Sequence, residues 1–100
     1  YSNAEIFSHA YKTLNHGTLV GKPTFGAVIS TGGAGLLNGA FIRLPFRAWY
    51  VKSTGENMEN GPDVPDVIVE NPPASRAANQ DAQLQKAVEI LLEQIDNPNK

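Results

Sequence analysis

The stretch YSNAEIF, residues 1–7, decides how the fold begins, because it carries the signals of a helix start. Ser2 is followed three positions later by Glu5, just before an apolar run, which is the capping-box pattern of a helix N-terminus. The Ser2 hydroxyl would then lie where free backbone N–H groups and the positive end of the helix dipole meet. The pattern by itself favours a capping serine, but the same position suits a serine nucleophile whose reaction develops negative charge.

Apolar residues at three- and four-residue steps predict two amphipathic helices in this chain. The first runs over residues 3–15, and Gly17 follows it as the expected left-handed C-cap. The second begins near Asn79 and is capped by Asn79 or Asp81. It ends at Asn97-Pro98, because proline cannot continue a helix.

Short strands are expected between the two helices, over residues 18–21, 27–31, 40–50 and 67–69. The sequence Gly-Gly-Ala-Gly at residues 32–35 predicts a flexible bend. Asn38-Gly39 predicts a hairpin with a two-residue loop. Pro45 lacks the amide hydrogen that a strand ladder needs, so it predicts an edge strand or a bulge.

This order of elements predicts an α/β chain with α+β-like character, in which short strands form a curved sheet flanked by two helices. A length of 100 residues and a hydrophobic content of 41% suit one small unit or part of a larger one. Because the first helix begins directly at the start of the sequence, we expect further structure upstream of Tyr1.

Composition argues against several classes of function. The net charge of -2 gives no basic footprint for nucleic acid, and no apolar run approaches the roughly 18 residues of a membrane-spanning segment. The absence of cysteine excludes disulfides and thiolate zinc sites. His9 and His16 do not have the spacing of a ligand motif, so neither a metal nor another cofactor is expected.

A serine nucleophile would need a base, because its free hydroxyl is protonated at neutral pH. His9 lies about two turns along the same predicted helix and is too far along the axis to reach Ser2. Lys22 could fold back, but nothing in the local sequence requires it. The residues alone therefore leave Ser2 as a nucleophile candidate without a visible base.

Four stretches occur in a characteristic order: SNAEIF at residues 2–7, LVGKPTFG at 19–26, MENG at 58–61 and VPD at 64–66. Together they resemble the C-terminal-processing, or tail-specific, serine peptidases, and in particular their tricorn-core-like branch. The resemblance covers most of the chain. It implies part of a Clp-protease/crotonase-like fold, with residues 1–100 as the C-terminal part of a serine peptidase catalytic domain.

The same resemblance implies roles for individual residues. Ser2 matches the nucleophile, and the backbone N–H of Asn3 matches one oxyanion donor. Glu59 matches the orienting glutamate of a Glu-Asn-x-Gly type motif, which is one residue shorter here. Ala27 stands where the tail-specific branch has its lysine base, so the resemblance points to a histidine base and a second oxyanion donor upstream of Tyr1.

The function implied is hydrolysis of peptide bonds through an acyl-enzyme on Ser2, with a polypeptide or peptide as substrate and an isolated chain that is inactive. The resemblance leaves room for a homo-oligomer, and it alone favours an extracytoplasmic location. The alternative is a non-catalytic ligand- or peptide-binding module on the same fold, in which Ser2 is only a cap. On that alternative five aromatic residues would line a groove, although a core role is the simpler expectation for them: Phe25, Phe41, Phe46, Trp49 and Tyr50.

Overall fold

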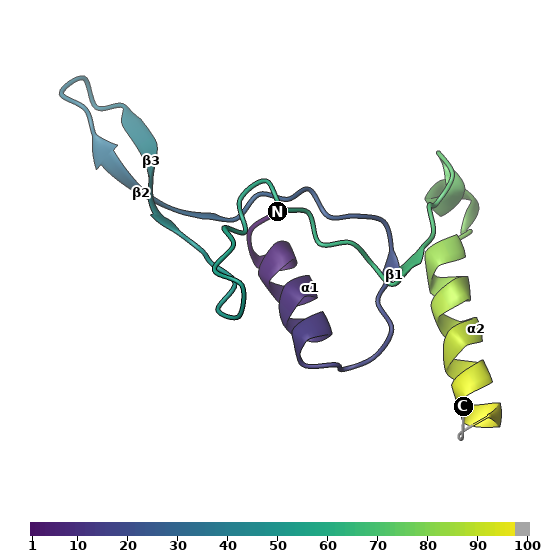
Figure 1. Ribbon diagram of the computed structural model, residues 1–100. Helices are drawn as coiled ribbons and strands as arrows, with labels where there is room; N and C mark the ends of the chain where they lie inside the picture. Colours follow the sequence, from purple (N-terminus) through teal and green to yellow (C-terminus); the bar gives the residue numbers. More distant parts are fainter. Residues whose placement is uncertain (98–100) are drawn as a thin grey trace. The chain divides into compact units, whose positions relative to one another are not determined.

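The computed structural model describes residues 1–97. Its elements follow one another along the chain as α1 (Asn3–Thr13), β1 (Val20–Gly21), β2 (Ile29–Gly35), β3 (Phe41–Ala48), β4 (Val67–Ile68), the 3-10 helix η1 (Ser75–Ala78) and α2 (Ala82–Asp96) (Figure 1). The chain divides into two compact units. Unit 1 holds residues 1–10 and 24–63, and unit 2 holds residues 11–23 and the described residues from 64 onward. Both predicted helices are present, and the first begins where the sequence placed it.

In unit 1, β2 and β3 form an antiparallel hairpin (Figure 1). The Leu36 amide donates to the Ala40 carbonyl at 2.8 Å and closes the hairpin end. Gly39 takes a positive φ of 83°, and its amide donates to the Leu36 carbonyl at 2.9 Å. The predicted hairpin is confirmed, but its loop holds Leu37 in addition to Asn38 and Gly39, as in loops that end on a left-handed glycine.

The glycine-rich residues 32–35 belong to strand β2, so the predicted bend at this place is wrong. Aromatic rings of the facing strand explain the difference. A Cβ on Gly33 would overlap the ring of Phe41, and one on Gly32 would lie 3.5 Å from the ring of Phe46. Glycine suits these positions because the rings occupy the space that a side chain would fill.

Pro45 lies at an irregularity of the hairpin, as its missing amide predicted. Ser30 pairs with Arg47 but Thr31 pairs with Pro45, so Phe46 is the extra residue of a bulge. A bulge accommodates a residue that cannot donate to the ladder.

The end of α1 differs from the prediction. The left-handed residue is Asn15, with φ 52°, and the His16 amide donates to the Tyr11 carbonyl at 3.1 Å. Asparagine tolerates this conformation because its short polar side chain can bond locally. Gly17 lies beyond the cap with φ 148°, where an added Cβ would lie 2.9 Å from the Tyr11 hydroxyl.

In unit 2, β1 and β4 are parallel, with Val20 opposite Val67. Helix α2 contacts β1, and the Gln83 side chain donates to the Val69 carbonyl at 2.9 Å. Asp81 caps α2 by accepting a hydrogen bond from the Leu84 amide at 3.0 Å, which decides between the two predicted caps.

The C-terminal end of α2 is closed at Asn97, whose amide donates to the Glu93 carbonyl at 3.0 Å. Pro98, which was also expected at this end, lies outside the described residues.

The predicted curved sheet is wrong, because the strands form two separate two-stranded sheets. Among the described elements, β2 and β3 contact only each other. Val28, 1% exposed, is the buried hydrophobic residue of the part that the structure describes. The five aromatic residues expected in a core are all exposed: Phe25, Phe41, Phe46, Trp49 and Tyr50.

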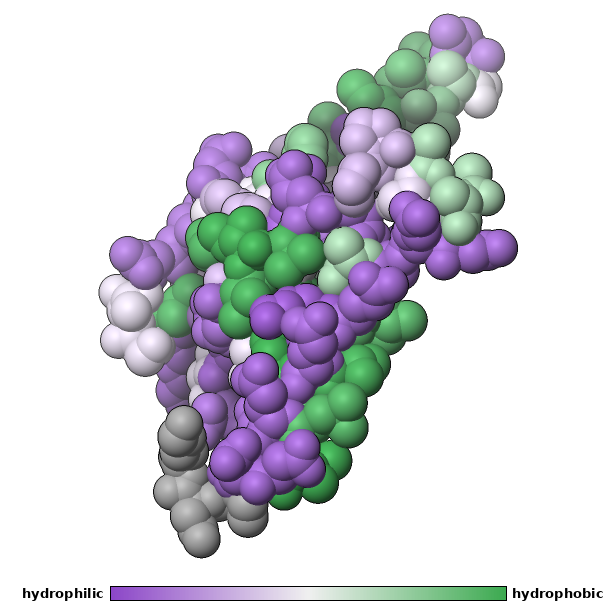
Figure 2. Space-filling model, turned by 90° about the vertical axis from the view of Figure 1, so that its right-hand side faces the viewer, coloured by the Kyte–Doolittle hydropathy of each residue, from purple (hydrophilic) through white to green (hydrophobic). Residues whose placement is uncertain are grey.

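Helix α2 also carries an exposed apolar stripe. Its large apolar side chains with at least 45% of their surface exposed recur along one side of the helix: Leu84, Val88, Leu91, Leu92 and Ile95. Figure 2 shows hydrophobic side chains gathered beside hydrophilic ones on the face that it presents. No helix within residues 1–97 has the length and hydropathy needed to cross a membrane.

Candidate active site

Ser2 occupies a tight turn directly before α1. Its φ is 57°, in the left-handed region that non-glycine residues rarely adopt. The Ser2 amide donates to the Ala27 carbonyl at 2.6 Å, and the Ser2 carbonyl accepts from the Ile6 amide at 3.1 Å. Such a conformation costs on the order of 1–3 kcal/mol and is maintained where the surrounding structure fixes the residue.

The helix start was predicted correctly, but the capping box is not formed. In residues 1–97 the Ser2 hydroxyl has no hydrogen-bond partner, and the Glu5 carboxylate binds the Gly26 amide at 2.9 Å. The reason is the backbone of Ser2, because a capping side chain reaches the helix amides from an extended conformation. The Ser2 hydroxyl is therefore not engaged in capping.

Glu5 is buried, with 1% of its surface exposed. Burial alone would raise the pKa of this carboxyl group. The Thr24 hydroxyl and the Gly26 amide favour the charged form and act to lower the pKa of Glu5 from its ordinary value. Glu5 is thus a carboxylate at neutral pH.

Residues 26–28 form a backbone segment whose amides and carbonyls hydrogen-bond the residues of the candidate site. At its first residue, the Gly26 amide donates to Glu5 and the Gly26 carbonyl accepts from the Asn60 amide at 2.6 Å. At its last residue, the Val28 amide donates to Glu59 Oε2 at 2.7 Å.

Glu59 and Ser2 are thus attached to neighbouring residues of one segment, although they are far apart in the sequence. Ser2 binds the carbonyl of Ala27 and Glu59 binds the amide of Val28. Glu59 is half-buried, and its own amide donates to Asn57 Oδ1 at 3.0 Å. The structure therefore brings two of the sequence-predicted site residues to adjacent positions of the same backbone.

Asn3, the predicted oxyanion donor, is the first residue of α1 and is exposed. Amides in the first turn of a helix have no acceptor within the helix. In the described part of the chain no acceptor binds the Asn3 amide. This amide is therefore available to a developing negative charge beside Ser2.

Neither of the two lysine positions considered from the sequence bonds the Ser2 hydroxyl in residues 1–97. Ala27, at the position of the lysine in the tail-specific branch, contributes its carbonyl to the Ser2 amide. Lys22 belongs to unit 2, where its amino group lies 3.2 Å from Glu70 Oε1. Across residues 1–97, no group of three or more metal-ligating side chains is found.

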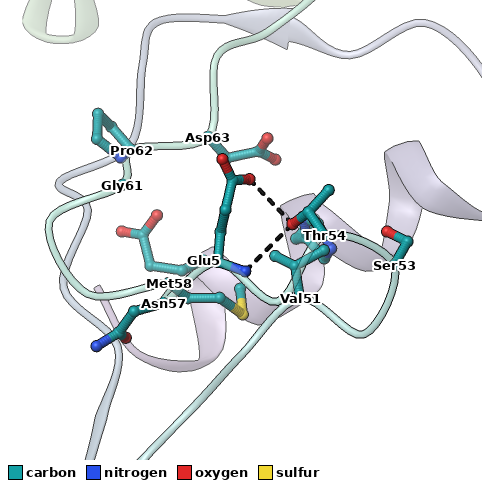
Figure 3. Close-up of a pocket in the computed structure, with 11 residues that line it drawn as sticks. Glu5, Val51, Ser53, Thr54, Asn57, Met58, Gly61, Pro62 and Asp63 are labelled. Atoms are coloured by element: carbon teal, nitrogen blue, oxygen red, sulfur yellow. Dashed lines mark hydrogen bonds between the residues drawn. The ribbon is translucent and has the colours of Figure 1, made fainter.

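Unit 1 also contains a cavity of about 660 Å³, which the sequence did not predict (Figure 3). Glu5 and His9 of α1 line it together with residues between Val51 and Asp63. Thr54 stabilises this wall, since its hydroxyl donates to Glu56 Oε2 at 3.0 Å and accepts from the Glu56 amide at 3.3 Å. The lining residues have the ordinary composition of a loop, so no sequence signal could have revealed the cavity.

Comparisons with known proteins show the family to which this chain belongs. Residues 1–69 match the model of peptidase family S41. The chain is 35% identical over 96 residues to the tricorn protease of Thermoplasma volcanium, an alignment covering 95% of this chain and 9% of that protein. It is 33% identical over 95 residues to a tricorn protease homolog of Saccharolobus solfataricus, covering 94% and 9% of the two chains.

A solved structure shows the same relationship. The crystal structure of the tricorn protease superposes with a TM-score of 0.86 at 31% identity, over 97% of this chain and 10% of that chain. The chain thus spans about a tenth of the length of these relatives. It belongs to peptidase family S41, a family of serine peptidases, and is tricorn protease-like.

Proposed function

We propose that residues 1–100 are the C-terminal part of the catalytic domain of a serine peptidase, with Ser2 as its nucleophile. The observation that carries this proposal is the geometry of Ser2. Its backbone is fixed in a left-handed turn by the Ala27 carbonyl, while its hydroxyl has no hydrogen-bond partner in residues 1–97. A side chain that only capped the helix would instead bind an amide of the first turn.

The proposed reaction passes through an acyl-enzyme. Ser2 Oγ attacks the carbonyl carbon of a peptide bond and transfers its proton to a base, which then protonates the leaving amine. The Asn3 amide and the positive end of the α1 dipole stabilise the oxyanion. A water molecule, deprotonated by the same base, then hydrolyses the acyl-enzyme and regenerates Ser2.

The base and a second oxyanion donor belong, in this proposal, to chain upstream of Tyr1. Ala27 cannot act as a base, and the described residues provide no side chain that bonds the Ser2 hydroxyl. Glu59 would orient the catalytic groups from its place on the Val28 amide. The exposed faces of the hairpin and of α2 are consistent with further chain packing on them, as a Clp-protease/crotonase-like domain would require.

The experiment is labelling of the full-length protein with a fluorophosphonate probe. We expect labelling of the wild type at Ser2 and none of Ser2→Ala. Ser8→Ala is the matched control, because Ser8 lies on the same helix with its hydroxyl donating to the Ala4 carbonyl at 2.9 Å. Labelling of Ser2→Ala at another serine would contradict the assignment, as would peptidase turnover by the isolated 100-residue chain.

The second candidate is a non-catalytic ligand- or peptide-binding module, and the 660 Å³ cavity of unit 1 is the observation that favours it. A binding module would not react with the probe, yet would bind a peptide with an affinity that changes when the cavity wall is altered. A wild-type protein labelled at Ser2 rejects this candidate.

A further inference from the structure

We propose that Glu5 is a positioning residue for Ser2, which it holds in place through the backbone of residues 26–28. The proposal rests on the proposed function and adds to it a residue that never touches the substrate. Its role would be to fix the segment that in turn fixes the Ser2 backbone.

The burial of Glu5 is the first observation. A carboxylate that is only 1% exposed loses most of its hydration, which is costly unless hydrogen bonds replace the lost water. Its Oε1 accepts from the Gly26 amide at 2.9 Å, and Gly26 is itself buried. A charge-assisted bond of this kind in a buried place restrains both partners strongly.

The position of the partner is the second observation. Gly26 directly precedes Ala27, whose carbonyl accepts from the Ser2 amide at 2.6 Å. Glu5 lies one turn after Ser2 on α1. Ser2 and Glu5 therefore bind the consecutive residues Ala27 and Gly26, so the first turn of α1 is attached to this backbone segment at two points.

The third observation is a second carboxylate on the same segment. Glu59 accepts from the Val28 amide at 2.7 Å, two residues beyond the amide that Glu5 binds. The Ala27 carbonyl that holds Ser2 lies between these two amides. A movement of either carboxylate would therefore shift the carbonyl that sets the Ser2 backbone, and misplacement of a nucleophile by about 1 Å can cost 100-fold in rate.

The test measures the rate constant of fluorophosphonate inactivation in the full-length protein, together with kcat and KM for a peptide substrate. Glu5→Ala removes the acceptor of the Gly26 amide, and we expect inactivation and kcat to fall about 10- to 100-fold with KM unchanged. Glu5→Gln keeps an acceptor oxygen at the same reach, so it should stay within about threefold of the wild type. Glu89→Ala is the control, because Glu89 is an exposed carboxylate on α2 that bonds Lys86 and does not line the cavity.

Glu5→Asp keeps the proposal testable if the alanine variant does not fold. It retains the charge but is one methylene shorter, so we expect slow inactivation in Glu5→Asp and fast inactivation in Glu5→Gln. The reverse order, or wild-type rates in Glu5→Ala and Glu5→Asp, would overturn the proposal while the wild type is still labelled at Ser2. A wild type that is not labelled at Ser2 would instead reject the proposed function.

Discussion

Gly26 offers a sharp test of how the candidate site is built. Its φ is 86°, and an added Cβ would lie 2.9 Å from the backbone nitrogen of Pro62. A left-handed conformation costs a residue with a side chain about 1–2 kcal/mol, and inserting an atom into a packed place costs about 1–3 kcal/mol. We therefore expect Gly26→Ala to lower the free energy of local opening by about 2–5 kcal/mol.

Gly55→Ala separates the two contributions. Gly55 also has a positive φ, 73°, but an added Cβ would meet nothing within 4 Å. Its substitution should cost only the conformational part, about 1–2 kcal/mol. Because Gly55 does not touch residues 26–28, its variant should keep the wild-type rate of fluorophosphonate labelling, whereas Gly26→Ala should slow labelling about tenfold or more.

The assay is amide hydrogen exchange in the full-length protein, followed at the amides of Ser2 and Val28, in parallel with the labelling rate. Local exchange is suitable because a single free energy of unfolding is not well defined for a long protein of several domains. Equal protection and equal labelling rates in the Gly26→Ala and Gly55→Ala variants would refute the reasoning. They would show that the Pro62 contact does not restrain the segment.

Two further predictions concern the hairpin and α2. Gly33→Ala should disrupt the hairpin and lower amide protection in β2, because the added Cβ would overlap the Phe41 ring. An added Cβ at Gly35 meets open space, so Gly35→Ala should leave amide protection in β2 within about twofold of the wild type. Equal protection in the two variants would contradict this. The pKa of Asp81 is lowered chiefly by the hydrogen bond from the Leu84 amide, and further by the bond from the Asn71 side chain. The stabilisation of α2 by this carboxylate is therefore present above the ordinary aspartate pKa and is lost as the pH falls through the lowered value. The protection factors of amides at the start of α2, taken against the intrinsic exchange rate at the same pH, should therefore fall at acidic pH in the wild type and not in Asp81→Asn. The same fall in that variant would refute the role of the carboxylate.

Local signals predicted the elements whose causes are local. The α1 start, the Asn38-Gly39 hairpin and the Asp81 cap depend on residues within a few positions of one another, and all three are present. The bulge at Pro45 belongs to the same class, because a missing amide has the same effect in any strand.

Partners distant in sequence decided the features that were predicted wrongly. Gly32 and Gly33 belong to a strand and face the rings of Phe46 and Phe41 on β3, which no local propensity can indicate. Glu5 has the spacing of a capping box, but its carboxylate binds Gly26 instead of the helix start. Here a tertiary hydrogen bond replaced the local one.

The residues of the candidate site were only in part open to prediction. The family resemblance proposed Ser2, Asn3 and Glu59 as site residues, and the structure adds how Ser2 and Glu59 are joined by residues 26–28. Glu5 and the cavity were missed as site features, because both depend on loops that are separate in the sequence.

The way residues 26–28 are held has a consequence for how this site could change. The segment contributes only main-chain groups to Ser2, Glu5 and Glu59. The side chain of Ala27 takes part in none of these bonds, so a substitution there leaves each of them in place. Position 27 is therefore a place where the side chain near the Ser2 backbone can change while the main-chain bonds that hold Ser2 stay the same.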